Sequence, residues 1–153
     1  MWPIIIVLLV LAMLVGPVML MQPSKAQKRL AALRQQATVL GLKVGASTVK
    51  APDGAPCWAY WLPVTDQSAL EPVLLERKNY EHGLHIAKYW FVKQGSGSQW
   101  PAQVASVLLE LPNSVHMLEL NEHAIGAHWT ERGGSETLEQ IAGNLKAMSA
   151  ALA

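Results

Sequence analysis

An uninterrupted apolar stretch opens this chain. From residue 4 to residue 21 every position is apolar, and Gly16 and Pro17 are the only breaks in its aliphatic character. About 20 helical residues span roughly 30 Å, which is the thickness of the hydrocarbon layer of a membrane. A cleaved signal peptide has bases before a shorter run and a small-residue cleavage site after it. Neither feature is present, so we expect residues 1–22 to form a transmembrane anchor.

Bases follow the anchor directly, and no basic side chain precedes it. Lys25, Lys28, Arg29 and Arg34 lie close to its exit. The positive-inside rule therefore predicts an N-terminus outside and a C-terminal domain in the cytoplasm, in a bacterial inner (cytoplasmic) membrane. We also predict that these four side chains form a membrane-surface site, because bases near anionic headgroups contribute about 1 kcal/mol each.

Helical and strand patterns alternate after the anchor. Residues 23–41 predict a basic juxtamembrane helix that Gly41 ends, and residues 42–153 predict one domain. Within this domain, strands are expected at 42–50, 57–65, 73–80, 84–93, 115–120 and 124–130, and helices at 101–110 and 135–152. Strands that follow one another directly pair antiparallel. We therefore predict an α+β fold, with a transmembrane helix, a mainly antiparallel sheet and two or three helices on one face.

Charge is distributed unevenly along the chain. The first 50 residues carry six bases and no acid, whereas residues 51–153 carry six bases and eleven acids. A domain with excess acid lacks the basic surface that a nucleic-acid backbone requires, so we predict no nucleic-acid partner. Cys57 is the only cysteine, which excludes an internal disulfide.

The histidines are the first candidates for chemistry. His82 and His85 are separated by two residues, and His116, His123 and His128 follow later. Metal ligands must converge in space, but residues of opposite parity on a strand point to opposite faces. We therefore predict no metal site and no cofactor.

The other reactive residues do not form a catalytic pattern. Adjacent residues on a strand point apart, so Glu81–His82 and Glu122–His123 are poor acid/base pairs. Cys57 lies beside Trp58 in an apolar stretch, which favours a buried, inert thiol. The glycine-serine stretch at 95–98 lacks the Lys-Ser/Thr of a phosphate-binding loop. We predict that the protein is not an enzyme.

Tryptophan is the most informative residue type in the domain. On a strand, Trp58 and Tyr60 share one face and Trp61 takes the other. Aromatic residues on both faces mean that both faces are covered or that one is a contact surface. The candidates for a partner surface are Trp58, Trp61, Trp90 and Trp129.

These patterns predict a membrane-anchored accessory or scaffold protein. Its partners are the lipid bilayer and another membrane or cytoplasmic protein. The alternative is a small-ligand or haem-binding sensor domain tethered to the inner membrane, which the histidines among aromatic residues suggest.

A resemblance to a known group covers about 30 residues. The apolar span, the proline at position 23 and the run Gln27-Lys28-Arg29-Leu30 resemble small single-pass inner-membrane proteins of proteobacteria, some of them labelled YajC-like. The group includes an accessory subunit of the Sec preprotein translocase. The resemblance implies a non-catalytic accessory role and no active-site residue. The domain of this chain is longer and richer in tryptophan than that group's.

Overall fold

The computed structural model describes residues 1–65, 71–80, 85–96 and 100–153. The chain forms two compact units, Met1–Ala32 and Leu33–Ala153. The first contains helix α1 (Trp2–Leu20) and the beginning of helix α2 (Lys25–Val39). All side chains of α1 are exposed, and α1 is long and apolar enough to cross a membrane.

Ser24 starts helix α2, as its position before the basic run suggests. The backbone N–H of Gln27 donates to Ser24 Oγ over 3.2 Å, and the N–H of Ser24 donates to Gln27 Oε1 over 2.8 Å. This reciprocal pair is a capping box. At the other end, Gly41 has φ +87° and the N–H of Leu42 bonds to the carbonyl of Ala37 over 2.9 Å. Glycine therefore ends the helix as predicted.

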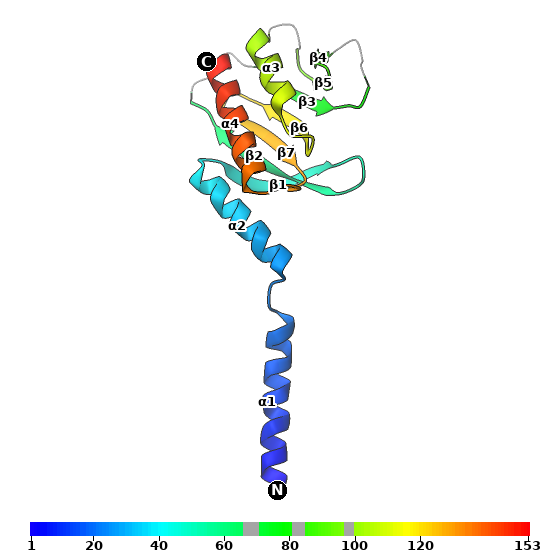
Figure 1. Cartoon of the computed structure of the whole chain (residues 1–153), viewed down its shortest axis with the longest axis vertical. Helices are drawn as coiled ribbons and strands as arrows, with labels where there is room; N and C mark the ends of the chain where they lie inside the picture. The colour runs from blue at the N-terminus through cyan, green and yellow to red at the C-terminus, as the bar shows by residue number, and fades with distance from the viewer. Residues whose placement is uncertain (66–70, 81–84, 97–99) are drawn as a thin grey trace. The chain divides into compact units, whose positions relative to one another are not determined.

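The second unit is built on a seven-stranded sheet (Figure 1). The strands are β1 (Lys43–Lys50), β2 (Pro56–Pro63), β3 (Val73–Arg77), β4 (His85–Ala87), β5 (Trp90–Gln94), β6 (Val115–Leu120) and β7 (Ala124–Trp129). Their order in the sheet is β1-β2-β7-β6-β3-β5-β4, and every neighbouring pair is antiparallel. Both predicted hairpins and the α+β class are confirmed.

The prediction of a single strand over 84–93 is wrong. Within the described residues this segment forms two strands, β4 and β5, joined by a turn at Lys88 and Tyr89. In the resulting hairpin His85 lies opposite Phe91. Neither turn residue is glycine, proline or asparagine, so the usual turn signal is absent from the sequence.

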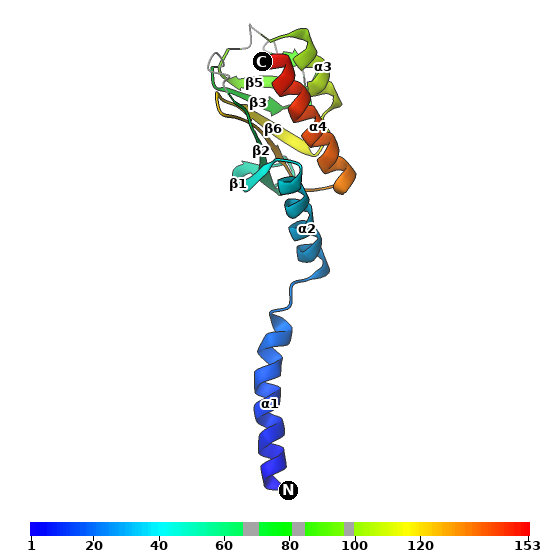
Figure 2. The same cartoon turned by 90° about the vertical axis from the view of Figure 1, so that its left-hand side faces the viewer.

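One face of the sheet is apolar across six of the seven strands. Strand register aligns a row of inward side chains across six strands: Val44, Tyr60, Ala127, Leu118, Leu75 and Val92. Helices α3 (Ala102–Glu110) and α4 (Ser135–Leu152) cover this face, as Figure 2 shows. Each fully buried aliphatic side chain contributes roughly 1.5–3 kcal/mol to folding. The core therefore lies between the sheet and these helices.

The opposite face has a mixed character. Register aligns a second row across all seven strands: Gly45, Ala59, His128, Met117, Glu76, Phe91 and His85. No helix of the described residues covers this row (Figure 2). We call this the open face of the sheet.

The last turns of α2 join the core through an ion pair whose carboxylate is buried and whose guanidinium is half-buried. Leu33 and Ala37 are buried in it, and between them Arg34 donates two hydrogen bonds to Glu131, each 2.7 Å long. The hydroxyl of Tyr60 donates a third bond to Glu131, also 2.7 Å. The hydrogen bond to Glu131 is the main reason that the pKa of Arg34 is raised. We call Arg34, Glu131 and Tyr60 the clasp.

The clasp corrects the prediction for Arg34. We expected this arginine to contact lipid headgroups together with the other three bases, but its guanidinium binds a carboxylate 97 positions away. Glu131 adopts φ +56°, a left-handed conformation that side chains with a Cβ disfavour. Three charge-assisted bonds stabilise that conformation, since they are possible only with the carboxylate in this place.

Replacing Arg34 by alanine is expected to lower the free energy of unfolding by about 3 kcal/mol. The side chain of Glu131 is only 5% exposed, so it would retain a buried charge with Tyr60 as its sole partner. Urea unfolding of the full chain in detergent, followed by tryptophan fluorescence, measures the loss. Lys28→Ala, an exposed position of the same helix, is the control and should change stability by less than about 0.5 kcal/mol. Equal unfolding midpoints for the two variants would show that the clasp is energetically unimportant.

Candidate functional site

The four predicted membrane-surface residues belong to two different units of the chain. Lys25, Lys28 and Arg29 are exposed in the first unit. Arg34 belongs to the second unit, where the clasp holds it. Lipid contact by the first three remains a prediction.

Two of the four tryptophans predicted for the partner surface lie in the core, so the prediction is wrong for them. Trp90 is 1% exposed and Trp129 is 0% exposed. Trp58 also points to the covered face, and the guanidinium of Arg34 stacks on its ring at 3.6 Å. Trp61 alone of the four lies on the open face, because its parity is opposite to that of Trp58. Of the four tryptophans, Trp61 is therefore the candidate that remains for a contact surface on the open face.

The indole of Trp61 lies flat on a glycine of the neighbouring strand. Gly126 is its register partner, and a Cβ built on Gly126 would stand 2.5 Å from Cε3 of the ring. Beyond this contact, the ring of Trp61 meets the imidazole of His128 edge to face, with centroids 5.8 Å apart. Glycine in the middle of a strand weakens the strand and marks a place where another group approaches the backbone closely. Here that group is the indole ring.

His128 bridges two strands beneath this ring. Its Nδ1 is 2.7 Å from the hydroxyl oxygen of Ser47, which also accepts the N–H of Val49 over 3.0 Å. Which of these two groups donates depends on the tautomer of the imidazole, because the hydroxyl oxygen has two lone pairs and can accept from both Val49 and Nδ1. Nε2 lies 3.6 Å from a carboxylate oxygen of Glu119. Burial lowers the pKa of His128 and Glu119 partly opposes it, so the ring is neutral at pH 7.

Serine, histidine and carboxylate in line are also the groups of nucleophilic hydrolases. In this chain Ser47 lies in the bulge of β1, where the register with β2 shifts, and the N–H of Val49 holds its oxygen. We interpret the series Ser47, His128 and Glu119 as a polar bridge that connects β1 to β7 across the small side chain of Ala59. The bulge and the lysines at both ends of β1 also protect this edge against pairing with another strand.

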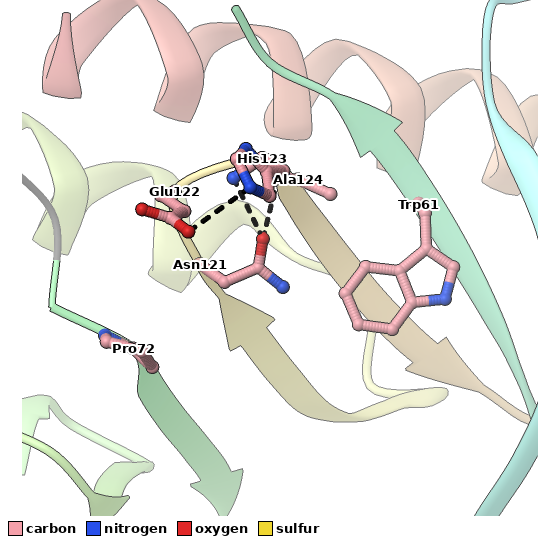
Figure 3. Close-up of a pocket in the computed structure, with 6 residues that line it drawn as sticks. All are labelled: Trp61, Pro72, Asn121, Glu122, His123 and Ala124. Carbon is pink, nitrogen blue, oxygen red and sulfur yellow. Dashed lines mark hydrogen bonds and ion pairs between the residues drawn. The ribbon is translucent and has the colours of Figure 1, made fainter. Parts of the chain in front are cut away.

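A hollow of about 490 Å³ opens at the end of the sheet beside Trp61 (Figure 3). It lies between the indole, Pro72 and the β6–β7 turn at 121–123. Asn121 Oδ1 accepts the N–H groups of His123 and Ala124 over 3.0 and 2.8 Å. Its amide nitrogen therefore points away from the turn, toward Trp61, as Figure 3 shows. The hollow thus offers a flat aromatic face and an amide donor.

One acidic side chain lines the hollow beside Trp61, which we call the Trp61 hollow, and two others are neighbours of its lining residues. Glu119 is next to Gly126 in the register, Glu122 lines the hollow, and Glu71 is exposed beside Pro72. Glu122 lies 3.2 Å from the imidazole of His123, and both side chains are exposed. The nearest base in the register is Lys43, opposite Trp61. This end of the open face therefore combines an aromatic ring with negative charge.

The other candidate residues do not converge. In the part of the chain that the structure describes, no three His, Cys, Asp or Glu side chains are placed to hold a metal ion. Glu81, His82 and Gly97-Ser98 lie outside the described residues. Cys57 is buried, and burial raises the pKa of its thiol. A buried thiol of raised pKa is a poor nucleophile at neutral pH.

Comparison with known proteins gives no relative. No family model matches the chain, and no curated protein and no solved structure matches it either. The resemblance to YajC-like proteins therefore remains a prediction.

Replacing Gly126 by alanine is expected to destabilise the protein by about 1–3 kcal/mol and to shift the emission of Trp61, because the new methyl group would overlap the indole. Gly45 is a matched control, since it lies on the same face and a Cβ there meets nothing within 4 Å. Gly45→Ala should leave stability equal or slightly higher. Urea unfolding of both variants measures the difference. If Gly126→Ala is as stable as Gly45→Ala, the ring does not lie on this glycine.

Proposed function

We propose that this protein is a single-pass bacterial inner-membrane protein whose cytoplasmic domain is a non-catalytic accessory module. In this proposal helix α1 crosses the bilayer and the Trp61 hollow binds an arginine or lysine side chain presented by a partner protein. The observation on which it mainly rests is the tryptophan of the open face, Trp61, with Glu122 in the wall of the same hollow and Glu119 opposite Gly126 in the register.

The composition of the first unit supports the membrane part of the proposal. Helix α1 has 19 residues and therefore spans roughly 29 Å, close to the thickness of the hydrocarbon layer. Its side chains are all exposed, so no protein core in the described chain accounts for their apolar character. Lys25, Lys28 and Arg29 follow, and bases at this position favour the cytoplasmic side.

The chain's own contacts support the choice of a basic partner. The guanidinium of Arg34 stacks on Trp58 at 3.6 Å, that of Arg77 on Trp90 at 4.8 Å, and the ammonium of Lys88 on Tyr89 at 5.2 Å. Such cation–π contacts contribute about 0.5–2 kcal/mol each, more when water is excluded. Within the described residues no cation stacks on Trp61. Nearby carboxylates would strengthen binding of a cation from outside.

Site-specific photo-crosslinking in cells tests the contact surface. A photoreactive residue at Lys43 or Glu122, which border the hollow, is expected to give one adduct of defined mass. The same residue at Leu109 or Lys146, exposed on the helical side, should give none. Trp61→Ala should abolish the adduct. The double variant Glu119→Gln with Glu122→Gln keeps the indole. It should lower the yield of the adduct, because it removes the negative charge.

Adducts of equal yield from the helical side, or no adduct from either position beside Trp61, would contradict the proposed surface.

The orientation of the chain in the membrane is measured with C-terminal fusions. A fluorescent protein that matures in the cytoplasm should be bright, and a periplasmic phosphatase should be inactive. The reverse result would place the domain outside.

A further inference from the structure

A second hollow lies at the opposite end of the sheet, where β3 ends and β6 begins. A cavity of about 510 Å³ is lined by Pro52, Arg77, Asn79, Tyr89, Asn113 and His116. An adjoining cavity of about 350 Å³ shares four of these residues, and its further charged lining residues are Lys50, Lys78 and Glu76. Together they are large enough for a small molecule of nucleotide size. We call them the Arg77 hollow.

Arg77 is a half-buried cation that bonds to no carboxylate among the described residues. Its guanidinium donates to Asn113 Oδ1 over 2.8 Å and to the carbonyl of Leu111 over 3.0 Å, and both acceptors are neutral. Its Nε is buried and has no acceptor among the described residues. Burial lowers the pKa of Arg77, because the charged guanidinium loses contact with water. Charged groups that lose water on folding are normally paired with an opposite charge, so the neutral partners of Arg77 call for an explanation.

Arg34 shows how the same domain treats an arginine that is needed for stability. Its guanidinium forms two 2.7 Å bonds to one carboxylate, and its pKa is raised. Arg77 also stacks on a tryptophan, but its pKa shifts in the other direction. The difference between the two arginines is an anion, which Glu131 supplies to Arg34 and which no described residue supplies to Arg77.

The surroundings of Arg77 favour an anion from outside the chain. The carboxylate of Glu76 is already shared by Lys78 at 3.1 Å and Lys93 at 3.7 Å. Asp53 pairs with Arg132 at 2.6 Å. Lys50 is exposed at the rim of the hollow. Bases therefore gather here in a domain with an excess of acids.

Neutral donors complete the site. Asn113 Oδ1 accepts from Arg77, so its amide nitrogen is a donor beside the guanidinium. Burial, and then the charge of Arg77, lower the pKa of His116, which keeps a neutral imidazole in the cavity wall. Tyr89 is 39% exposed and, with Pro52, offers an apolar surface for a flat group. An arginine beside several donors suits the oxygens of a phosphate.

We propose that the Arg77 hollow binds a phosphate-bearing small molecule, whose phosphate pairs with Arg77 and whose flat or apolar part lies against Tyr89 and Pro52. This site is at the other end of the sheet from Trp61 and does not depend on the proposed partner surface. The proposal gives the domain a small-ligand function, as did the alternative that the histidines suggested. The group that is recognised is a phosphate and not haem.

Calorimetric titration of the full chain in phosphatidylcholine nanodiscs tests the site, with pyrophosphate and adenosine monophosphate as probes and adenosine as the control without phosphate. Both phosphates are expected to bind, and adenosine at least about tenfold more weakly. Arg77→Lys, which keeps the charge but loses the planar fork, should weaken binding by about tenfold. Lys50→Gln at the exposed rim should weaken it by about threefold. Lys146→Gln, exposed on α4, should have no effect.

Three results would overturn the proposal. One is that neither phosphate binds at millimolar concentration. Another is that Lys50→Gln and Arg77→Lys bind like the parent chain, or that Lys146→Gln weakens binding as much as they do. The third is binding of phosphatidylglycerol vesicles that depends on Arg77 without binding of free phosphates, which would assign the phosphate to a lipid headgroup. If Arg77→Lys does not unfold cooperatively in urea, Lys50→Gln decides.

Discussion

The sidedness of the antiparallel sheet is the constraint on which the rest of the structure depends. Successive side chains of a strand point to opposite faces, so each residue of a row across the strands is either under the helices or on the open face. The row through Tyr60, Leu118 and Leu75 forms the core against α3 and α4. The row through His128 and Phe91 lies on the open face, where His128 bonds to Ser47. A shift of one residue in the pairing of β2 would turn Trp58 to the open face and Trp61 to the covered face. It would therefore disrupt both rows.

Buried charge divides the domain into parts with different roles. Arg34 and Glu131 compensate each other, and their bonds hold the end of α2 against Tyr60 and the core. Among the described residues Arg77 bonds to neutral acceptors only. Glu122 lines the hollow beside Trp61 at one end of the sheet, and Lys50, Arg77 and Lys78 line the cavities at the other end together with Glu76. The ion pair of Arg34 and Glu131 forms within the chain, whereas we propose that the charged residues at both hollows bind other molecules.

Local patterns predict much of this fold but few of its contacts. Proline and glycine between apolar runs indicate the hairpin β1–β2, a short polar stretch at 121–123 indicates β6–β7, and helical periodicity indicates α3 and α4. Parity alone also separates Trp61 from Trp58. The turn at Lys88 and Tyr89 lacks such a signal. Long-range pairs are not visible in sequence either, because nothing near Arg34 indicates that Glu131 returns to it or that Arg77 has no such partner. Gly126 was a missed signal, since a glycine inside a strand marks a close approach.

Oxidation of tryptophans by N-bromosuccinimide, located by mass spectrometry on the full chain in nanodiscs, tests the sidedness of the sheet most directly. The structure predicts that Trp61 reacts well before Trp90 and Trp129, which should stay intact until urea unfolds the domain. If Trp90 or Trp129 reacts as fast as Trp61 in the folded protein, or if Trp61 is as protected as they are, the assignment of covered and open faces is wrong.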